Sequence, residues 1–284
     1  MVDLNLEEER ESEPRKVWGL AVAILVILAG AAAIYYFGFV KKPAAPPAPP
    51  EQAAAAAVPA EGEKAAAEGE AAPLAFPPVG LADSDPAVRE FAAALSANPE
   101  FAKWLLTKDL VRKFVVAVDN VANGLSPKPH VDFFSPSGGF RVARTKKGTF
   151  IDEAGYARYA PVVGVAASID AAAAVRLYKA AKPIIDEAYK DLGYPGVDFG
   201  ETLVRAMVEL LETPVVDGPV GLEQKILSYA MTDASLEALS AAQKQLLRMG
   251  PKGVRAVQGK VRELAAALGV PGSRLPAART YTPR

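Results

Sequence analysis

The chain of 284 residues contains no cysteine and one histidine, His130. The absence of cysteine excludes disulfide bonds, thiol nucleophiles, thiolate metal sites and iron–sulfur clusters. A single histidine excludes every site that needs two imidazoles, such as the paired-histidine zinc motif of metalloproteases. His130 follows Pro129 in a segment without helical periodicity, so we expect it to be an ordinary loop or packed residue.

Sequence motifs for nucleotide binding and nucleophilic catalysis are missing too. The chain has no P-loop, no Gly-x-Gly-x-x-Gly fingerprint, no Gly-x-Ser-x-Gly elbow and no Ser-x-x-Lys pair. No Asp-rich loop has the spacing of a calcium site. The sequence therefore predicts no cofactor and no metal ion. The near balance of 32 basic and 33 acidic residues also argues against a general polyanion binder.

The first positive feature is a long uncharged run, residues 17–40. At about 1.5 Å per residue it spans about 36 Å, enough to cross a hydrocarbon core of about 30 Å. Aromatic residues lie near both ends and cations flank both sides, as is typical of a span. We expect an uncleaved single-pass transmembrane helix that contacts the lipid bilayer. A cleaved signal peptide is the alternative, because residues 29–33 resemble a small-residue cleavage site.

The segments on either side of this run have no pattern that could build a core. Residues 1–16 are charged and polar, and they predict a disordered N-terminal arm. Residues 41–80 are rich in alanine and proline, and they predict a disordered linker that holds a domain away from the membrane. Three cations precede the span and two follow it, which favours a cytoplasmic N-terminus and a domain on the opposite side of the membrane.

Residues 81–269 predict a mainly α-helical globular domain. Apolar stripes with helical spacing occur in residues 109–122, 170–192, 199–210 and 239–268. Residues 140–145 and 149–151 predict a small β-hairpin, and residues 214–231 contain an apolar run that we expect to be partly extended. Pro183 lies inside a helical stripe and predicts a kink or a break there. Residues 270–284 hold three prolines and predict a flexible tail.

Five phrases in this region resemble a known family. They are residues 84–90 (SDPAVRE), 114–120 (FVVAVDN), 156–159 (YARY), 187–195 (EAYKDLGYP) and 239–251 (LSAAQKQLLRMGP). Over about residues 83–268, in the same order, the chain resembles a bacterial family of single-pass envelope proteins that is catalogued as a domain of unknown function. The resemblance supports the order of span, linker and domain, and it implies a span in the bacterial inner membrane with the domain in the periplasm. It transfers no catalytic residue, because the family has no assigned activity.

The polar and aromatic residues within these phrases are the candidates for a ligand or partner surface. They are Asp119, Asn120, Tyr156, Arg158, Tyr159, Tyr189, Tyr194, Gln243, Lys244 and Arg248. Tyrosine and arginine are common anchors of interfaces. Each candidate also has a structural interpretation: a helix end for the first two, packed rings for the tyrosines, a buried pair for Arg158 and a solvated helix face for the last three.

Three function classes remain compatible with the sequence. The leading hypothesis is a non-enzymatic, membrane-tethered periplasmic module that binds or scaffolds an unknown envelope protein or polymer. The first alternative is an envelope glycan or peptidoglycan hydrolase, which requires two carboxylates about 5–9.5 Å apart in one cleft. The second is a cytoplasmic nucleic-acid-binding domain that uses the basic C-terminal helices, and we expect nucleic acid to be an unlikely partner because the domain is expected in the periplasm.

Overall fold

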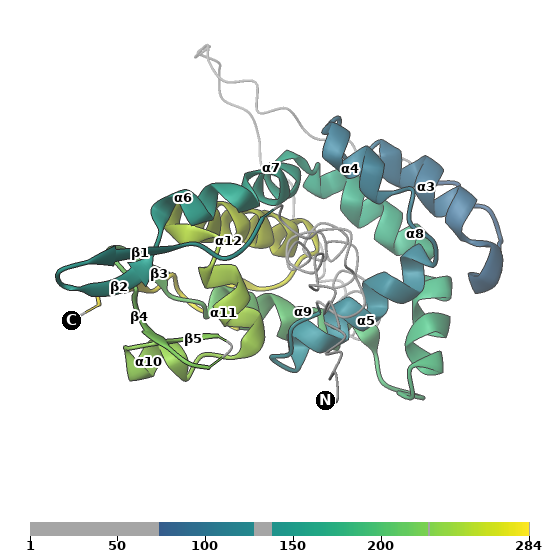
Figure 1. Ribbon diagram of the computed structural model, residues 1–284. Helices are drawn as coiled ribbons and strands as arrows, with labels where there is room; N and C mark the ends of the chain where they lie inside the picture. The colour runs from purple at the N-terminus through teal and green to yellow at the C-terminus, as the bar shows by residue number, and fades with distance from the viewer. Residues whose placement is uncertain (1–73, 128–137, 227, 284) are drawn as a thin grey trace, which may run out of the picture.

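The computed structural model describes residues 74–127, 138–226 and 228–283. The predicted arm 1–16, the predicted span 17–40, most of the linker and His130 lie outside the described residues, so these expectations stay predictions. Within the described residues the protein is mainly α-helical and carries a small antiparallel sheet at one end (Figure 1).

The elements follow one another along the chain without an internal repeat. The α-helices are α3 (Asp85–Ala93), α4 (Pro99–Trp104), α5 (Leu110–Ala122), α6 (Glu153–Tyr156), α7 (Ala160–Ser168), α8 (Ala171–Asp191), α9 (Phe199–Leu211), α10 (Ala234–Glu237), α11 (Ala241–Leu247) and α12 (Gly250–Ala267). The strands are β1 (Val142–Thr145), β2 (Gly148–Ile151), β3 (Val215–Val216), β4 (Gly221–Gln224), β5 (Tyr229–Met231) and β6 (Thr280–Tyr281). Short 3-10 turns are η2 (Leu81–Asp83), η5 (Ala157–Tyr159) and η6 (Gly272–Arg274).

Polar side chains mark the starts of several helices. The Asn98 side chain accepts a hydrogen bond of 2.9 Å from the amide of Glu100 at the start of α4. The Asp170 carboxylate accepts one of 2.7 Å from the amide of Ala173 at the start of α8. Each bond satisfies an amide that has no partner within its own helix.

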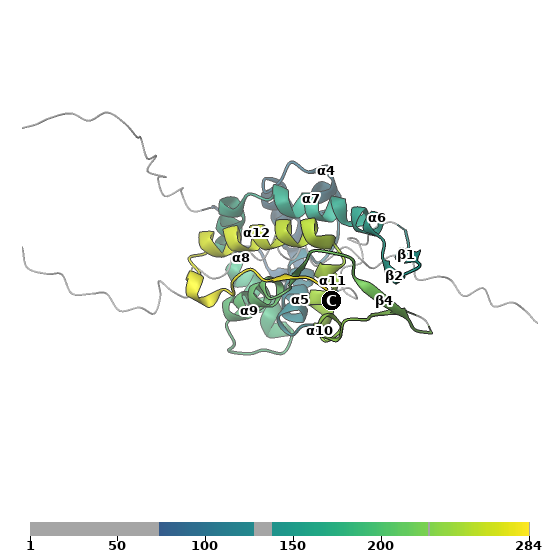
Figure 2. The same ribbon diagram turned by 90° about the vertical axis from the view of Figure 1, so that its left-hand side faces the viewer.

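The large core lies among the long helices. Figure 2 shows α12 running between α7 on one side and α8 and α9 on the other. The apolar stripe of α5 is fully buried at Val115, Val118 and Val121, as is Val257 of α12. The helical spacing of these residues therefore turns one face of each helix toward a shared interior, as the sequence predicts.

The small sheet has the strand order β1-β2-β4-β5, and all three of its pairings are antiparallel. Thr145 pairs with Gly148 across the turn that joins β1 and β2, which confirms the predicted hairpin. The predicted extended run within residues 214–231 is also confirmed, because it supplies β3, β4 and β5. A second, smaller apolar cluster lies under this sheet and includes Ile151, Leu222 and Met231.

Of the two outcomes expected at Pro183, a break in the helix is wrong, because α8 runs unbroken from Ala171 to Asp191. Pro183 is exposed, whereas the next two residues, Ile184 and Ile185, are buried in the core. Packing of this apolar face keeps the helix continuous although the proline removes one backbone hydrogen bond.

The tail also differs from the expected flexible segment. The amide of Val215 donates to the carbonyl of Arg279 at 2.8 Å, and the amide of Asp217 donates to the carbonyl of Tyr281 at 3.1 Å. These bonds make β6 a parallel partner of β3. The buried strand β3 needs a partner for its backbone groups, and the end of the chain supplies one.

In the part of the chain that the structure describes, no single helix has the length and apolar composition to cross a membrane. The segments Glu153–Ser168 and Ala171–Asp191, which are bent by 76° relative to each other, pass that test together by length and composition only.

Candidate functional site

A cleft of about 400 Å³ lies between the small sheet and the α10–α11 segment. It is lined by Phe140, Ile151, Leu222, Gln224, Lys225, Ile226, Ser228, Tyr229, Met231, Glu237, Lys244 and Arg248. Its volume is in the range of pockets that hold small molecules or short peptide segments. Two residues of the predicted partner surface, Lys244 and Arg248, therefore share one concave site.

Lys244 is held at the cleft by Glu237 of α10. Its Nζ atom donates to the Glu237 Oε1 atom at 2.9 Å and to the Glu237 carbonyl at 2.8 Å. The other carboxylate oxygen of Glu237 accepts a bond of 2.8 Å from the amide of Met231 on β5. Burial acts to raise the pKa of Glu237, but the hydrogen bonds from Lys244 and Met231 outweigh it and hold the pKa below its usual value.

Arg248 follows Lys244 by one helical turn and caps the C-terminal end of α11. Burial lowers the pKa of Arg248, while Tyr159 and Glu237 nearby act in the opposite direction. A guanidinium stays protonated in proteins, so this side chain brings a positive charge into a partly desolvated wall. An anion in the cleft is attracted more strongly there than at an open surface.

Most of the remaining lining is apolar or aromatic, and the polar residues among it are Gln224, Lys225 and Ser228. The rings of Phe140 and Tyr229 lie 5.9 Å apart at the rim, and Ile151, Leu222 and Met231 belong to the small core beneath. The cleft therefore combines three cations, Lys225, Lys244 and Arg248, and one carboxylate with an apolar wall. This arrangement fits a ligand that joins a negative group to an apolar body.

Two of the predicted surface residues, Arg158 and Tyr159, belong to η5. Tyr159 is fully buried, which agrees with its interpretation as a packed ring, and its hydroxyl finds no hydrogen-bond partner among the described residues. Arg158 donates from Nε to the carbonyl of Gly155 at 3.0 Å and from Nη1 to the carbonyl of Gly138 at 2.9 Å. These contacts give Arg158 a role in holding the chain rather than in contacting a ligand.

Tyr156 lies against the start of α12. Gly250 has a backbone φ of +74°, and a Cβ atom placed there would lie 2.6 Å from the Tyr156 Cγ atom. Burial, followed by the charge of Glu153, raises the pKa of Tyr156 to about 12. The Tyr156 ring, at the end of α6, therefore packs directly against the start of α12.

A second group of predicted residues lies around the ends of α5 and α8. The Tyr189 ring stacks on the Tyr194 ring at 4.8 Å, and the Tyr189 hydroxyl shares a bond of 2.8 Å with the Thr202 hydroxyl. Burial raises the pKa of Asp119. The charge of Asp119 in turn raises the pKa of Tyr194, which is 37% exposed. Asn120 contributes its carbonyl to the amide of Leu125 at 2.7 Å and so helps to end α5.

Gln243 has a structural place between helices. Its side chain completes a capping box with Ser240 at the start of α11, and its Nε2 atom donates to the carbonyl of Glu209 at 3.2 Å. With 8% of its surface exposed, it is buried rather than part of a solvated face. Local capping and one long-range bond account for its contacts.

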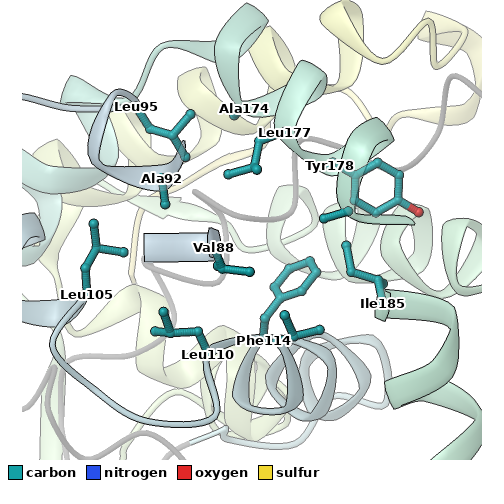
Figure 3. Close-up of a pocket in the computed structure, with 12 residues that line it drawn as sticks. Val88, Ala92, Leu95, Leu105, Leu110, Phe114, Ala174, Leu177, Tyr178 and Ile185 are labelled. Carbon is teal, nitrogen blue, oxygen red and sulfur yellow. The ribbon is translucent and has the colours of Figure 1, made fainter. Parts of the chain in front are cut away.

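An apolar hollow of about 40 Å³ lies among α3, α5 and α8 (Figure 3). Figure 3 shows Val88, Leu105 and Phe114 turned toward it, while the Tyr178 hydroxyl points away. Burial raises the pKa of Tyr178, and the hydroxyl has no hydrogen-bond partner in the described part of the chain. The hollow has the size of a packing gap and offers a ligand no polar contact, so the cleft is the better candidate.

Sequence reasoning identified Lys244 and Arg248 as candidates but missed Phe140, Lys225, Ile226, Tyr229 and Glu237. Strand periodicity in residues 214–231 was the available signal, but it does not show which residues face a helix. Across the ranges that the structure describes, no group of three or more histidine, cysteine, aspartate or glutamate side chains could hold a metal ion.

Comparison with known proteins gives one match. A family model described as "Protein of unknown function (DUF3014)" matches residues 110–265, which include every residue that lines the cleft. Neither the search of curated proteins nor the search of solved structures gave a match.

Proposed function

The chain belongs to the DUF3014 family, whose function is unknown, and from the cleft we propose that it is a membrane-tethered binding module of the bacterial cell envelope. The cleft takes a segment of a partner that carries a carboxylate beside apolar groups. The observation that carries the proposal is the joint presence of Lys244 and Arg248 in a cleft with an apolar wall.

The chemistry of the lining favours a carboxylate-bearing segment over a free inorganic anion. A planar guanidinium matches a carboxylate with two parallel hydrogen bonds, and partial burial strengthens the attraction. The apolar wall at Ile151, Leu222 and Met231 gives the neighbouring part of such a ligand a surface to cover. A free anion would contact the cations of the cleft and leave this wall in water.

The tether is the second part of the proposal. The uncharged run 17–40 has the length and flanks of a span, and the alanine- and proline-rich linker 41–80 has the composition of a spacer. We propose that the domain lies in the periplasm, within reach of envelope proteins and polymers, because the cations beside the run 17–40 favour a cytoplasmic N-terminus.

The geometry gives the hydrolase alternative no support. That reaction needs two carboxylates at one cleft, and Glu237 is the single carboxylate among the described residues that line this one. Glu237 is also bound to Lys244 at 2.9 Å. The binding function is therefore the one that the lining favours.

The test is site-specific photo-cross-linking with the full-length chain in living cells. A benzophenone amino acid replaces Tyr229 at the rim of the cleft, and irradiation is expected to yield a discrete adduct with a partner. Arg248→Gln in the same chain should reduce the yield about tenfold or more, because charge-assisted hydrogen bonds contribute about 1.5–3 kcal/mol.

The matched control carries the benzophenone at Leu106, which is 73% exposed and lies just after α4. The proposal is wrong if positions 229 and 106 give the same adducts, or if Arg248→Gln leaves the adduct at position 229 unchanged while the protein stays folded. Gln243→Ala removes a buried side chain outside the lining, so it should leave the adduct in place.

A further inference from the structure

The tips of two hairpins lie at the same end of the small sheet. Thr149 near the start of β2 pairs with Leu222 of β4 in antiparallel register, so the β1–β2 turn and the end of β4 are neighbours. Arg144 of β1 also reaches across, with Nη2 3.5 Å from both the Gln224 Oε1 atom and the Tyr229 hydroxyl. Figure 1 shows the β1–β2 hairpin projecting at the end of the molecule opposite α3.

These tips carry a concentration of positive charge. Arg144, Lys146, Lys147 and Lys225 are all exposed. Glu223 lies among them and pairs with Lys225 at 2.8 Å. For Lys146 and Lys147, no ion pair forms with any residue that the structure describes. Three positive charges therefore remain in excess at this end of the sheet.

Ile226, at the same tip, is 98% exposed. Isolated exposed apolar residues are common, but this one follows Lys225 directly and lies beside a lysine pair on the next hairpin. Cations that surround a projecting apolar side chain form the pattern of proteins that bind the surface of a bilayer. We name Arg144, Lys146, Lys147, Lys225 and Ile226 the sheet-tip surface.

We propose that the sheet-tip surface docks on a lipid membrane with anionic headgroups. The cations contact the headgroups, and Ile226 enters the boundary between headgroups and acyl chains. A soluble anionic polymer would satisfy the cations but would leave Ile226 in water, and this difference favours the lipid. Lys225 and Ile226 also line the edge of the cleft, but neither Lys244 nor Arg248 takes part, so the two proposals are tested at different residues.

The experiment uses the absence of cysteine from the chain. Ser228→Cys, next to the tip, gives one attachment point for a fluorophore that responds to lipid. The labelled full-length chain is combined with vesicles of phosphatidylcholine alone or of phosphatidylcholine with phosphatidylglycerol. We expect a blue shift and quenching by brominated acyl chains with phosphatidylglycerol only, and loss of both signals at high salt.

Matched variants separate the two contributions. Lys146→Gln and Lys147→Gln should each weaken the contact about fivefold, since a cation near an anionic surface contributes about 1 kcal/mol. Ile226→Ser keeps every charge and should reduce the quenched fraction about tenfold. A fluorophore at Leu106→Cys, near α4, reports the background.

Three outcomes would overturn the inference. One is equal quenching in the two kinds of vesicle, and another is quenching at position 106 as strong as at position 228. The third is a fluorophore response to dissolved polyphosphate but none to phosphatidylglycerol, which would identify the surface as a polymer site. None of these outcomes affects the cross-linking test of the cleft.

Discussion

At the scale of single residues, the contact of Gly250 with Tyr156 is a strict steric constraint. Gly250→Ala would place a Cβ atom 2.6 Å from the Tyr156 Cγ atom at a backbone φ of +74°. Both effects destabilise the fold, and we expect a loss of about 2–4 kcal/mol in the free energy of unfolding. Urea denaturation followed by circular dichroism measures this loss.

Gly259, in the same helix, is the matched control. No heavy atom lies within 4 Å of a Cβ atom placed there, and the residue is in the middle of α12. Gly259→Ala should therefore raise the free energy of unfolding by about 0.5–1 kcal/mol, because alanine favours the helix. A Gly250→Ala protein as stable as Gly259→Ala would contradict the steric argument.

Asp233 predicts a distinct dependence on pH. Hydrogen bonds from Ser235, then from the Tyr281 hydroxyl, hold the pKa of this carboxyl at about 2, below its usual 3.8. A lowered pKa stabilises the folded state above about pH 4, and that contribution is lost as the pH falls through about 2. Between about pH 4 and pH 2, the free energy of unfolding of the wild-type protein should fall, and that of Asp233→Asn should fall less.

Substitution of Tyr281, which donates a hydrogen bond to Asp233, tests the cause of the lowered pKa. Tyr281→Phe removes one of the two side-chain donors, so the pKa of Asp233 should rise toward its usual value. Carboxyl NMR titration of the folded protein measures it directly. An unchanged pKa in Tyr281→Phe would show that the tail does not contribute to the Asp233 carboxylate.

At the scale of elements, α8 is a helix that continues through a proline. Pro183 is exposed and removes a backbone hydrogen bond, while Ile184 and Ile185 keep their buried contacts. Pro183→Ala should restore the bond and raise the free energy of unfolding by about 1–3 kcal/mol. Thermal unfolding measures the gain, and a Pro183→Ala protein that is less stable than the wild type would show that the proline contributes packing the helix needs.

The same element shows how far sequence reasoning reaches. Apolar spacing located the regions of α5, α8, α9, α11 and α12, because each of these helices has a buried face. The spacing could not show that α8 would pass through Pro183, because that depends on the packing of Ile184 and Ile185 against other helices. Local pattern therefore predicts helices better than it predicts where they break.

At the scale of the whole molecule, the closing of the fold by its tail can be tested by truncation. Ending the chain after Ala278 removes both hydrogen bonds between β3 and the tail, as well as the Tyr281 contact with Asp233. We expect a loss of about 1–3 kcal/mol, at about 1 kcal/mol for each net hydrogen bond. Hydrogen exchange should accelerate in β3 and α10 and stay slow in α5, whereas uniform acceleration would contradict a local role.

The position of the chain relative to a membrane is the largest open prediction. Reporters that are active only in the cytoplasm or only in the periplasm are fused in turn after Arg284. A periplasmic signal is expected, because the cations beside the run 17–40 favour a cytoplasmic N-terminus. A cytoplasmic signal would overturn the proposed tether and make the basic helix α12 the place to test for nucleic-acid binding.

The candidate site was predictable only in part, because some of its residues are brought together only when the whole chain folds. Lys244 and Arg248 lie one turn apart in a single phrase, so sequence alone groups them. Phe140 and Tyr229 meet at 5.9 Å across a long stretch of chain, and no local pattern encodes such a contact. For Tyr159 the sequence left both a partner surface and a packed ring open, and tertiary packing buries it completely.

The parallel pairing of β3 with β6 has a consequence for synthesis. A ribosome, or a secretion channel, releases the chain from its N-terminal end, so residues 215–216 emerge well before residues 280–281. During that interval the backbone groups of β3 and the Asp233 carboxylate lack their final partners. The last step of folding therefore waits for translation to pass Tyr281, and a nascent chain that stalls before it presents an open strand edge to its surroundings.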